Sequence, residues 1–322
     1  MRMILDAALS FHGAALAGVP LSSLFLSFMA YGFLGWLWES TVCAYANYRR
    51  FANSGFLLGP CCPIYGVGAL ACWLLLRGIG NTAALFLAAM IVCSAIEYVV
   101  GWALERLTGA RFWDYSDMPF NVHGRVCLYG ALLFGLGSVL VCRVAEPWLL
   151  GIMAQLPRVL VAVVALAVAV MLALDTVFAV ASWKRLSSRL ETLRADIAER
   201  VNEGLEDMSD KVVSSMPEEL VRGANTMQMR TRAVNGWLAT ISDAVLDAVR
   251  SYRRVPSFTA DGRRGLRTVA ETAEGAADRL KLFLDRRDLR FFNAFPKIKI
   301  PSYEGVLRAT RLKERARDLF GK

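Results

Sequence analysis

Charged side chains are scarce in the first half of this 322-residue chain. Residues 1–183 contain nine arginines, eight acidic residues and no lysine, so the remaining 28 basic and 20 acidic residues lie in residues 184–322. The two halves carry formal net charges of +1 and +8. Charged residues make up 20% of the chain, against about 25% in soluble domains, which argues against a water-soluble enzyme. The pattern predicts a membrane domain followed by a basic soluble domain.

Two further absences narrow the class of protein. Residues 184–322 contain no cysteine, and the seven cysteines of the apolar half are expected to be small buried hydrophobic residues rather than a disulfide framework. The chain also contains no G-x-x-x-x-G-K-[ST] loop, so any ATPase must be a separate chain. We therefore predict no enzyme, no catalytic residue, no cofactor, no metal and no nucleic-acid partner.

Long stretches without Asp, Glu, Lys or Arg predict membrane helices. Five such runs occur, at residues 13–38, 51–76, 78–96, 126–142 and 159–174. About 20 apolar residues cross a bilayer, and flanking aromatic and arginine side chains extend the shorter runs. We expect five helices, at residues 20–47, 60–76, 81–105, 126–144 and 159–183. Residues 1–19 are expected to form an interfacial segment, because Asp6 and His12 interrupt a signal-peptide core.

The distribution of positive charge predicts the orientation. Connections rich in basic residues follow the first, third and fifth expected helices, at Arg49, Arg50, Arg106, Arg111, Arg125, Lys184, Arg185 and Arg189. Such connections are cytoplasmic in multi-pass proteins. We expect a protein of the cell membrane with its N-terminus outside and residues 184–322 in the cytoplasm.

Three acidic residues fall inside expected membrane helices: Glu39, Glu97 and Asp175. A charge at that depth costs several kcal/mol unless it is paired, protonated or hydrated. Glycines share their helix faces at a spacing of three or four residues, and small residues let a second helix approach. These faces are Gly32, Gly35 and Glu39 in the first helix, and Glu97, Gly101 and Glu105 in the third. The acids either line a polar path or hold helices together as neutral or hydrogen-bonded groups. For Asp175 we favour the second, structural role.

The membrane half contains an apparent internal repeat. Gly35 to Glu39 and Gly101 to Glu105 both read G-W-x-x-E. Downstream, Phe51, Asn53, Gly55, Gly59, Cys62, Tyr65 and Gly66 resemble, with one-residue slips, Phe120, Asn121, Gly124, Cys127, Tyr129 and Gly130. The pattern predicts that residues 20–76 repeat as residues 81–144 in the same orientation, a device of transporters.

Two connecting loops carry the densest polar chemistry. The first runs from Asn53 through Gly55, Gly59, Pro60, Cys62 and Pro63 to Gly66. It forms a turn that leads into the start of a helix, where free backbone N–H groups can bind an anion. The second runs from Trp113 through Asp114, Tyr115 and Asn121 to Arg125. Asp114, Asp117 and His123 can be interpreted as metal ligands of a lipid-modifying enzyme, but capping and pairing with arginines is favoured. A zinc site of Cys61, Cys62, Cys127 and His123 is disfavoured because C-x-x-C spacing is missing.

Four ordered motifs resemble those of one family. They are Phe51-x-Asn53-x-Gly55-Phe56, Gly59-Pro60-x-Cys62-Pro63-Ile64-Tyr65-Gly66, Trp113-Asp114-Tyr115-Ser116 and Phe120-Asn121-x-x-Gly124-Arg125-x-Cys127-Leu128. Together they are similar to the type IV ABC-transporter permease family, or CmpB family, of bacterial membrane proteins. The likeness covers about residues 20 to 175, with a tail signature at Ala294-Phe295-Pro296. Ser54 and Cys61 depart from the family pattern. The resemblance implies a transport role and a separate ATPase partner.

The basic half reads as a set of helices. Apolar residues repeat every three or four positions, at Leu186, Leu190, Leu193, Ile197, Val201, Leu205, Met208 and Val212. This coiled-coil spacing extends the fifth membrane helix until just before Pro217. Residues 218–252 and 263–292 predict two more helices. The three helices either pack only on each other or form a docking surface for a partner or a second copy.

The predicted fold class is an all-α, polytopic membrane protein with a C-terminal, coiled-coil-like cytoplasmic domain. The segments are residues 1–19, 20–183 and 184–322. The first functional hypothesis is a permease-like subunit in which Glu39 and Glu97 line a polar path, surrounded by membrane lipids. The alternative is a membrane-anchored scaffold or regulator that acts through its tail. The lipid-modifying enzyme ranks third. Substrate, direction, energy source and oligomeric state are left open.

Overall fold

A computed structural model describes residues 2–214, 286–303 and 313. Helices dominate these residues, and the only strands among them form two hairpins of two-residue strands. The chain begins with helix α1 (Arg2–Gly13), followed by the first hairpin, strands β1 (Ala15–Leu16) and β2 (Val19–Pro20). The expected helices 218–252 and most of 263–292 lie outside the described residues.

The first helical pair lies between residues 21 and 76. Helix α2 (Leu21–Trp38) passes through a single π-helical turn η1 (Glu39–Cys43) into α3 (Ala44–Tyr48). Arg49, in the left-handed conformation at φ 55°, ends this run. Helix α4 (Pro63–Leu76) begins on a proline, whose fixed φ suits the first helical position, and packs along α2.

The second helical pair repeats this order of long helix, loop and returning helix. Helix α5 (Thr82–Thr108) is capped by Asn81, which accepts hydrogen bonds from the N–H groups of Ala83 and Ala84. The second hairpin, β3 (Asn121–Val122) with β4 (Val126–Cys127), leads into α6 (Leu128–Leu140), which packs along α5. A second π-helical turn, η2 (Val141–Ala145), continues into α7 (Glu146–Gln155).

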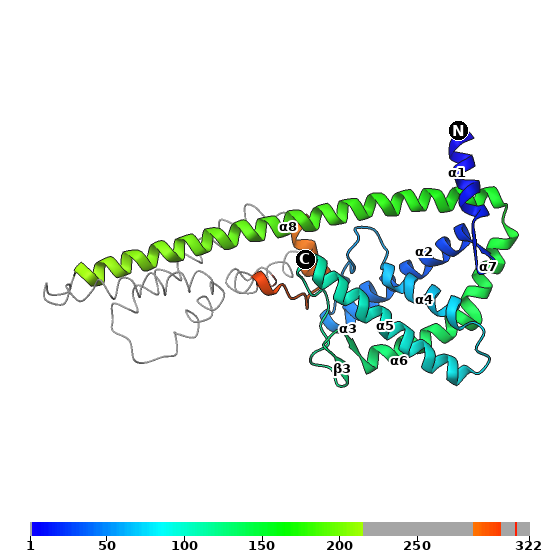
Figure 1. Cartoon of the computed structure of the whole chain (residues 1–322), viewed down its shortest axis with the longest axis horizontal. Helices are drawn as coiled ribbons and strands as arrows, with labels where there is room; N and C mark the ends of the chain where they lie inside the picture. Colours follow the sequence, from blue (N-terminus) through cyan, green and yellow to red (C-terminus); the bar gives the residue numbers. More distant parts are fainter. Residues whose placement is uncertain (1, 215–285, 304–312, 314–322) are drawn as a thin grey trace. The chain divides into compact units, whose positions relative to one another are not determined.

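The longest helix follows a break at Pro157. Helix α8 runs without interruption from Arg158 to Ser214, so the apolar helix continues into the charged stretch as its leucine spacing indicates (Figure 1). Leu186, Leu190 and Leu193 are buried. Near the end of the chain lie α13 (Arg286–Ala294) and a 3-10 turn η4 (Pro301–Tyr303).

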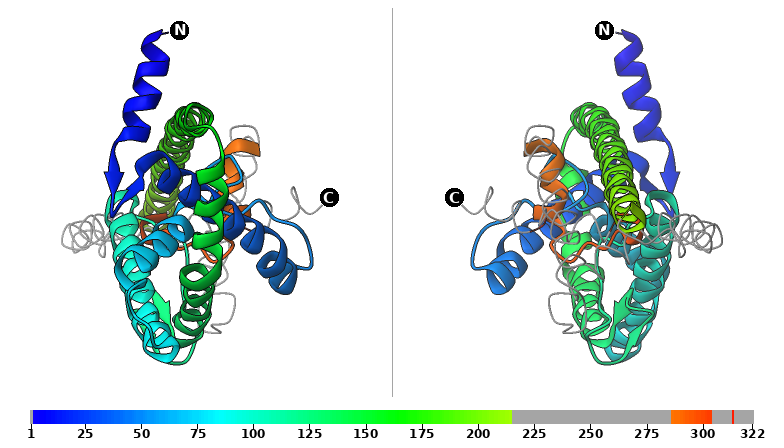
Figure 2. Two further views of the ribbon diagram at one scale, coloured as in Figure 1. Left: turned by 90° about the vertical axis from the view of Figure 1, so that its right-hand side faces the viewer. Right: turned by 90° about the vertical axis from the view of Figure 1, so that its left-hand side faces the viewer.

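The chain forms two compact units. The first unit contains residues 1–181 together with Phe291–Lys299, and the second contains residues 182–290 and 300–322. In the first unit, α4 packs on both α2 and α5, and α5 packs on α6 (Figures 1 and 2). Its apolar core includes Leu24, Trp73, Leu85, Cys72 and Cys93. Six of the seven free cysteines are buried and Cys43 is half-buried.

Hydrogen bonds place the helix ends of the first unit. Arg77, at the end of α4, donates to the carbonyl of Ala17 just before α2. Arg143, in η2, donates to the carbonyls of Ile79 and Gly80 just before α5. These contacts bring the start of α2, the end of α4, the start of α5 and the turn after α6 to one end of the unit. Successive helices therefore run in alternating directions.

Four helices are long and apolar enough to cross a membrane: Leu21–Ala46, Thr82–Thr108, Leu128–Gln155 and Arg158–Ala195. Two expected boundaries were wrong. The second span begins at Pro63 rather than residue 60 because Cys62 is in an extended conformation, and the 14 residues of α4 fall short of the usual span length. The fourth span continues to Gln155 rather than residue 144, because Arg143 and Glu146 both find protein partners within the unit.

Candidate functional site

Two of the expected intramembrane acids lie in the interior of the first unit. Glu39 opens the π-helical turn η1, and its carboxylate accepts a hydrogen bond from the hydroxyl of Tyr65 on α4. The Tyr65 ring lies edge-on against Phe134 of α6, with ring centroids 5.8 Å apart. The contact of Glu39 with Tyr65 therefore sits where α2, α4 and α6 meet.

Glu97 is deeply buried, with 5% of its surface exposed. It lies on α5, and among the described residues its Oε2 atom has no hydrogen-bond partner. Gly130 of α6 lies beside it, since a Cβ atom built there would be 3.9 Å from Glu97 Oε2. A buried carboxylate oxygen without a partner is costly, so this position calls for a proton, water or a passing ligand.

Tyr115, from the second loop, lies close to both acids. Burial raises the pKa of the Tyr115 hydroxyl, and the nearby carboxylates of Glu97 and Glu39 raise it further. The phenol thus remains protonated and able to donate a hydrogen bond. We call Glu39, Tyr65, Glu97 and Tyr115 the carboxylate–tyrosine cluster.

Glycines allow the helices around this cluster to approach. A Cβ atom on Gly35 of α2 would overlap the Tyr65 ring, and one on Gly66 of α4 would overlap the backbone carbonyl of Phe28. A Cβ atom on Gly32 would come within 2.7 Å of the Cys61 sulfur. The glycine face predicted for the first helix therefore points into the unit, as small residues at helix contacts do.

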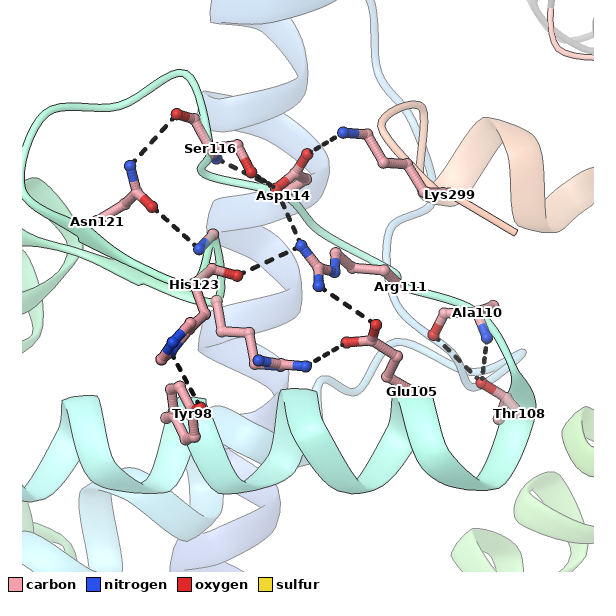
Figure 3. A network of polar contacts seen from close by, with 12 residues as sticks. Tyr98, Glu105, Thr108, Ala110, Arg111, Asp114, Ser116, Asn121, His123 and Lys299 are labelled. Carbon is pink, nitrogen blue, oxygen red and sulfur yellow. Dashed lines mark hydrogen bonds and ion pairs between the residues drawn. The ribbon is translucent and has the colours of Figure 1, made fainter. Parts of the chain in front are cut away.

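Glu105 and Gly101 do not join the cluster. Glu105 accepts from Arg111, just before the second loop, at 3.2 Å (Figure 3), and from Arg125, at the end of that loop, at 2.7 Å. Gly101 lies against the indole of Trp113, which donates to the carbonyl of Arg125. The acids of the two G-W-x-x-E motifs therefore have different partners. The two expected repeats are alike in another respect, because α4 and α6 each begin directly after a cysteine in an extended conformation, Cys62 or Cys127.

The second loop is held together by its own polar residues. Asn121 donates to the carbonyl of Ser116 (Figure 3) and to that of Met118, and it accepts from the N–H of Gly124. Gly124 has φ +67°, a conformation that glycine adopts without steric cost. His123 lies against Tyr98, whose hydroxyl is 3.2 Å from His123 Nδ1.

Asp114 connects the second loop to the segment Phe291–Lys299. Its carboxylate pairs with Lys299, accepts from the Ser116 hydroxyl at 2.6 Å and lies 3.6 Å from Arg111 (Figure 3). Backbone hydrogen bonds between Arg111 and Lys299 add to this contact. Partial burial raises the pKa of Asp114, but the hydrogen bonds from Lys299 and Ser116 prevail and lower it to about 2. Asp114 is therefore ionised at neutral pH, and its carboxylate is already paired with cationic side chains.

The first loop folds back on α2 and on α8. Asn53 accepts from the indole of Trp36 at 2.6 Å and donates to the carbonyl of Leu58. Asp175 of α8 accepts from the backbone N–H groups of Leu58 and Gly59, each at 2.8 Å. The N–H groups expected to face an anion in this turn are thus bound by the side chain of Asp175. Gly55 has φ +105°, and Pro60 is exposed.

The geometry gives little support to a metal centre. In residues 2–214, 286–303 and 313, no group of three His, Cys, Asp or Glu residues is placed to hold a metal ion. Burial, with nearby Asp175, raises the pKa of Cys61 to about 11, and burial, with nearby Glu39, raises that of Cys62 to about 12.

Sequence reasoning missed one buried acid, Glu146. It is fully buried at the start of α7, and the Tyr31 hydroxyl of α2 donates to its Oε2 atom at 2.8 Å. It was passed over because Arg143 ended the charge-free run before it. The available signal was a polar row on α2, Ser23, Ser27 and Tyr31, which needs a polar partner in an otherwise apolar helix.

Neutralising Asp114 should destabilise the first unit. We expect Asp114→Asn to lower its free energy of unfolding by about 1–3 kcal/mol, because two cationic neighbours lose their partner. The pKa of Asp114 is about 2 in the folded protein, below its ordinary value near 3.9, so the contribution is complete above that value and disappears as the pH falls toward about 2. Thermal unfolding in detergent across this range measures it. A difference between the two proteins that is unchanged across the range would contradict the assignment.

Comparison with known proteins identifies the membrane half. A search of curated proteins and of solved structures gave no significant match. Residues 26–180, which include α2, α4, α5, α6 and the carboxylate–tyrosine cluster, match a family model whose description is "Putative ABC-transporter type IV". This is the family that the loop motifs resemble, and residues 26–180 of the membrane half match its model.

Proposed function

We propose that this protein is the permease-like membrane subunit of a transporter, and that the carboxylate–tyrosine cluster lines its polar path. The family match supports transport as the class of function. The observation that carries the path itself is Glu97, which is 5% exposed within a helix able to cross the membrane and has an unpartnered oxygen beside Gly130. A polar group kept at such cost inside a bilayer is a functional site by default.

In this proposal the path runs between the two helical pairs. Glu39 comes from the first pair and Glu97 from the second, and Tyr115 lies close to both. Transporters built from repeats place their binding site at the interface of the repeats, near the middle of the membrane. We assign residues 20–76 and 81–144 as the two repeats.

The alternating helix directions support five crossings, with α4 as the shortest. An odd number places the two ends of the membrane domain on opposite sides. Together with the arginine-rich loops, this assigns the N-terminus to the outside and the tail to the cytoplasm. The energy source is then a separate ATPase subunit, since this chain has no nucleotide-binding loop. Purification in mild detergent, followed by mass spectrometry of the proteins that accompany the chain, would identify this ATPase subunit.

Water access to position 97 tests the path without knowledge of the substrate. We expect Glu97→Cys, in proteoliposomes, to react with a charged, membrane-impermeant thiol reagent at least about tenfold faster than Val99→Cys, because only a polar path brings water to that depth. Val99 is the matched control, since it lies two residues away on α5 with 58% of its surface exposed toward the expected lipid side. The wild-type chain, with its buried cysteines, gives the background.

Labelling should be measured with and without ATP and the co-purified ATPase. A path that opens during transport predicts faster labelling of Glu97→Cys in one of the two conditions. Equal, background labelling of both variants in both conditions would remove Glu97 from any path. Glu97→Gln, which keeps the shape of the side chain, reports separately whether the protein still assembles.

The alternative, a scaffold or regulator that acts through its tail, is favoured by one observation. The segment Phe291–Lys299, which follows the basic tail region, packs within the first unit through Phe291 and Lys299. Because this segment contacts the loops of the membrane half, the binding of a partner to the tail can change the conformation of those loops. Partner proteins that bind residues 184–322, combined with background labelling at position 97, would select this reading.

A further inference from the structure

A second acidic site lies in the first unit, apart from the proposed path. Glu146 and Ser27 are both fully buried, and the Tyr31 hydroxyl donates to Glu146 Oε2 at 2.8 Å. Glu146 stands at the start of α7, where the helix of the fourth span continues beyond the π-helical turn η2. The site therefore joins α2 to the second half of the fourth span.

The described residues around Glu146 provide no cation. The titratable groups that face it are Tyr31 from α2 and Cys142 from η2, and both are neutral donors in their ordinary state. Arg143 lies on the same turn, but its guanidinium donates to the carbonyls of Ile79 and Gly80. An ionised carboxylate without a cationic partner costs several kcal/mol in a membrane interior.

Two buried polar atoms at this site lack hydrogen bonds. Besides Tyr31, the Ser27 side chain also lies beside the Glu146 carboxylate. Yet within the described residues neither Ser27 Oγ nor Glu146 Oε1 has a hydrogen-bond partner. A proton on Glu146 would remove the uncompensated charge, and the neutral acid could either donate to the Ser27 hydroxyl or accept from it. A hard metal cation would need about six oxygen ligands, more than these three side chains supply.

Further polar side chains lie on α2 toward its N-terminus. Ser22 and Ser23 are buried on the same helix, toward its N-terminus. The Ser22 hydroxyl lies 2.8 Å from Nδ1 of His12, which is partly exposed on α1.

From this geometry we propose that Glu146 binds a proton in the membrane interior, with Tyr31 and Ser27 as the polar side chains beside it. This site is independent of the path at Glu39 and Glu97. It gives the protein a group that can couple proton movement to another process.

Infrared difference spectroscopy of the full-length protein in detergent tests the proposal. The C=O stretch of a protonated carboxylic acid is separate from the bands of ionised carboxylates. We expect wild type at neutral pH to show a protonated-acid component that Glu146→Gln lacks, while Glu105→Gln, at an acid paired with two arginines, retains it. Tyr31→Phe should shift the frequency of this component, because the acid loses one hydrogen bond.

Each other outcome overturns the proposal. An ionised-carboxylate signal in the difference between wild type and Glu146→Gln at neutral pH would show that no proton is bound. Loss of the component when sodium chloride replaces choline chloride at constant pH would make this a sodium site. If Glu146→Gln does not fold, Tyr31→Phe carries the test alone, and an unchanged frequency in that variant would assign the signal to another acid.

Discussion

Replacing Phe291 by alanine should release the segment Phe291–Lys299 from the first unit. Phe291 is fully buried, and its ring packs against Phe56 of the first loop with centroids 5.6 Å apart. The neighbouring Phe295 packs against Phe112 of the second loop at 4.9 Å. Removal of a buried phenylalanine side chain costs about 3–5 kcal/mol. We expect a loss of this size in the free energy of unfolding, and new protease cleavage close to Phe291.

Phe120 provides the matched control for this experiment. It carries the same side chain and lies in the second loop, but 80% of its surface is exposed. Phe120→Ala should change the stability in detergent by less than about 0.5 kcal/mol. Equal effects of the two substitutions would mean that the segment contributes nothing specific to the first unit.

Gly35→Ala should disrupt the packing of α2 on α4. A Cβ atom at this position would overlap the Tyr65 ring, and Tyr65 is the hydrogen-bond donor to Glu39. Overpacking a close helix contact costs about 1–3 kcal/mol. We therefore expect a lower midpoint of thermal unfolding in detergent, together with a changed environment of Glu39. Crosslinking between cysteines placed on α2 and α4 would report the altered spacing.

Gly137→Ala is the control for the steric argument. Gly137 lies in the middle of α6, and nothing lies within 4 Å of the position its Cβ atom would take. Alanine there should leave the protein unchanged or stabilise it by up to about 1 kcal/mol, because alanine favours a helix. If Gly35→Ala were tolerated as well as Gly137→Ala, the close contact of α2 with α4 would not exist.

The helical membrane architecture was readable from the sequence because hydropathy and spacing are local properties. Charge-free runs located α2, α4, α5, α6 and the start of α8 but not α7, and the leucine spacing after residue 183 marked the continuation of α8. The loop motifs identified the family whose model matches residues 26–180. Helical periodicity predicted that Gly35 faces a neighbouring helix, but it also grouped Glu105 with Glu97, whereas Glu105 pairs with arginines instead.

The partners of the polar residues were not readable, because they depend on which distant segments meet. Glu105 carries the same G-W-x-x-E motif as Glu39, yet it pairs with one arginine of the second loop and one just before it. Asp175 binds N–H groups more than a hundred residues away in the first loop. Glu146 lay outside the run of apolar residues that defined its helix, and only its contact with Tyr31 reveals it as a buried acid.

The sequence by itself determined that the first half of the chain is a bundle of apolar helices, since a segment that lacks charge has no stable place in water. Only the tertiary structure decided what each buried acid faces. A helix fixes the direction of a side chain relative to its own axis, whereas the group that meets this side chain is set by the packing of helices far apart in the chain.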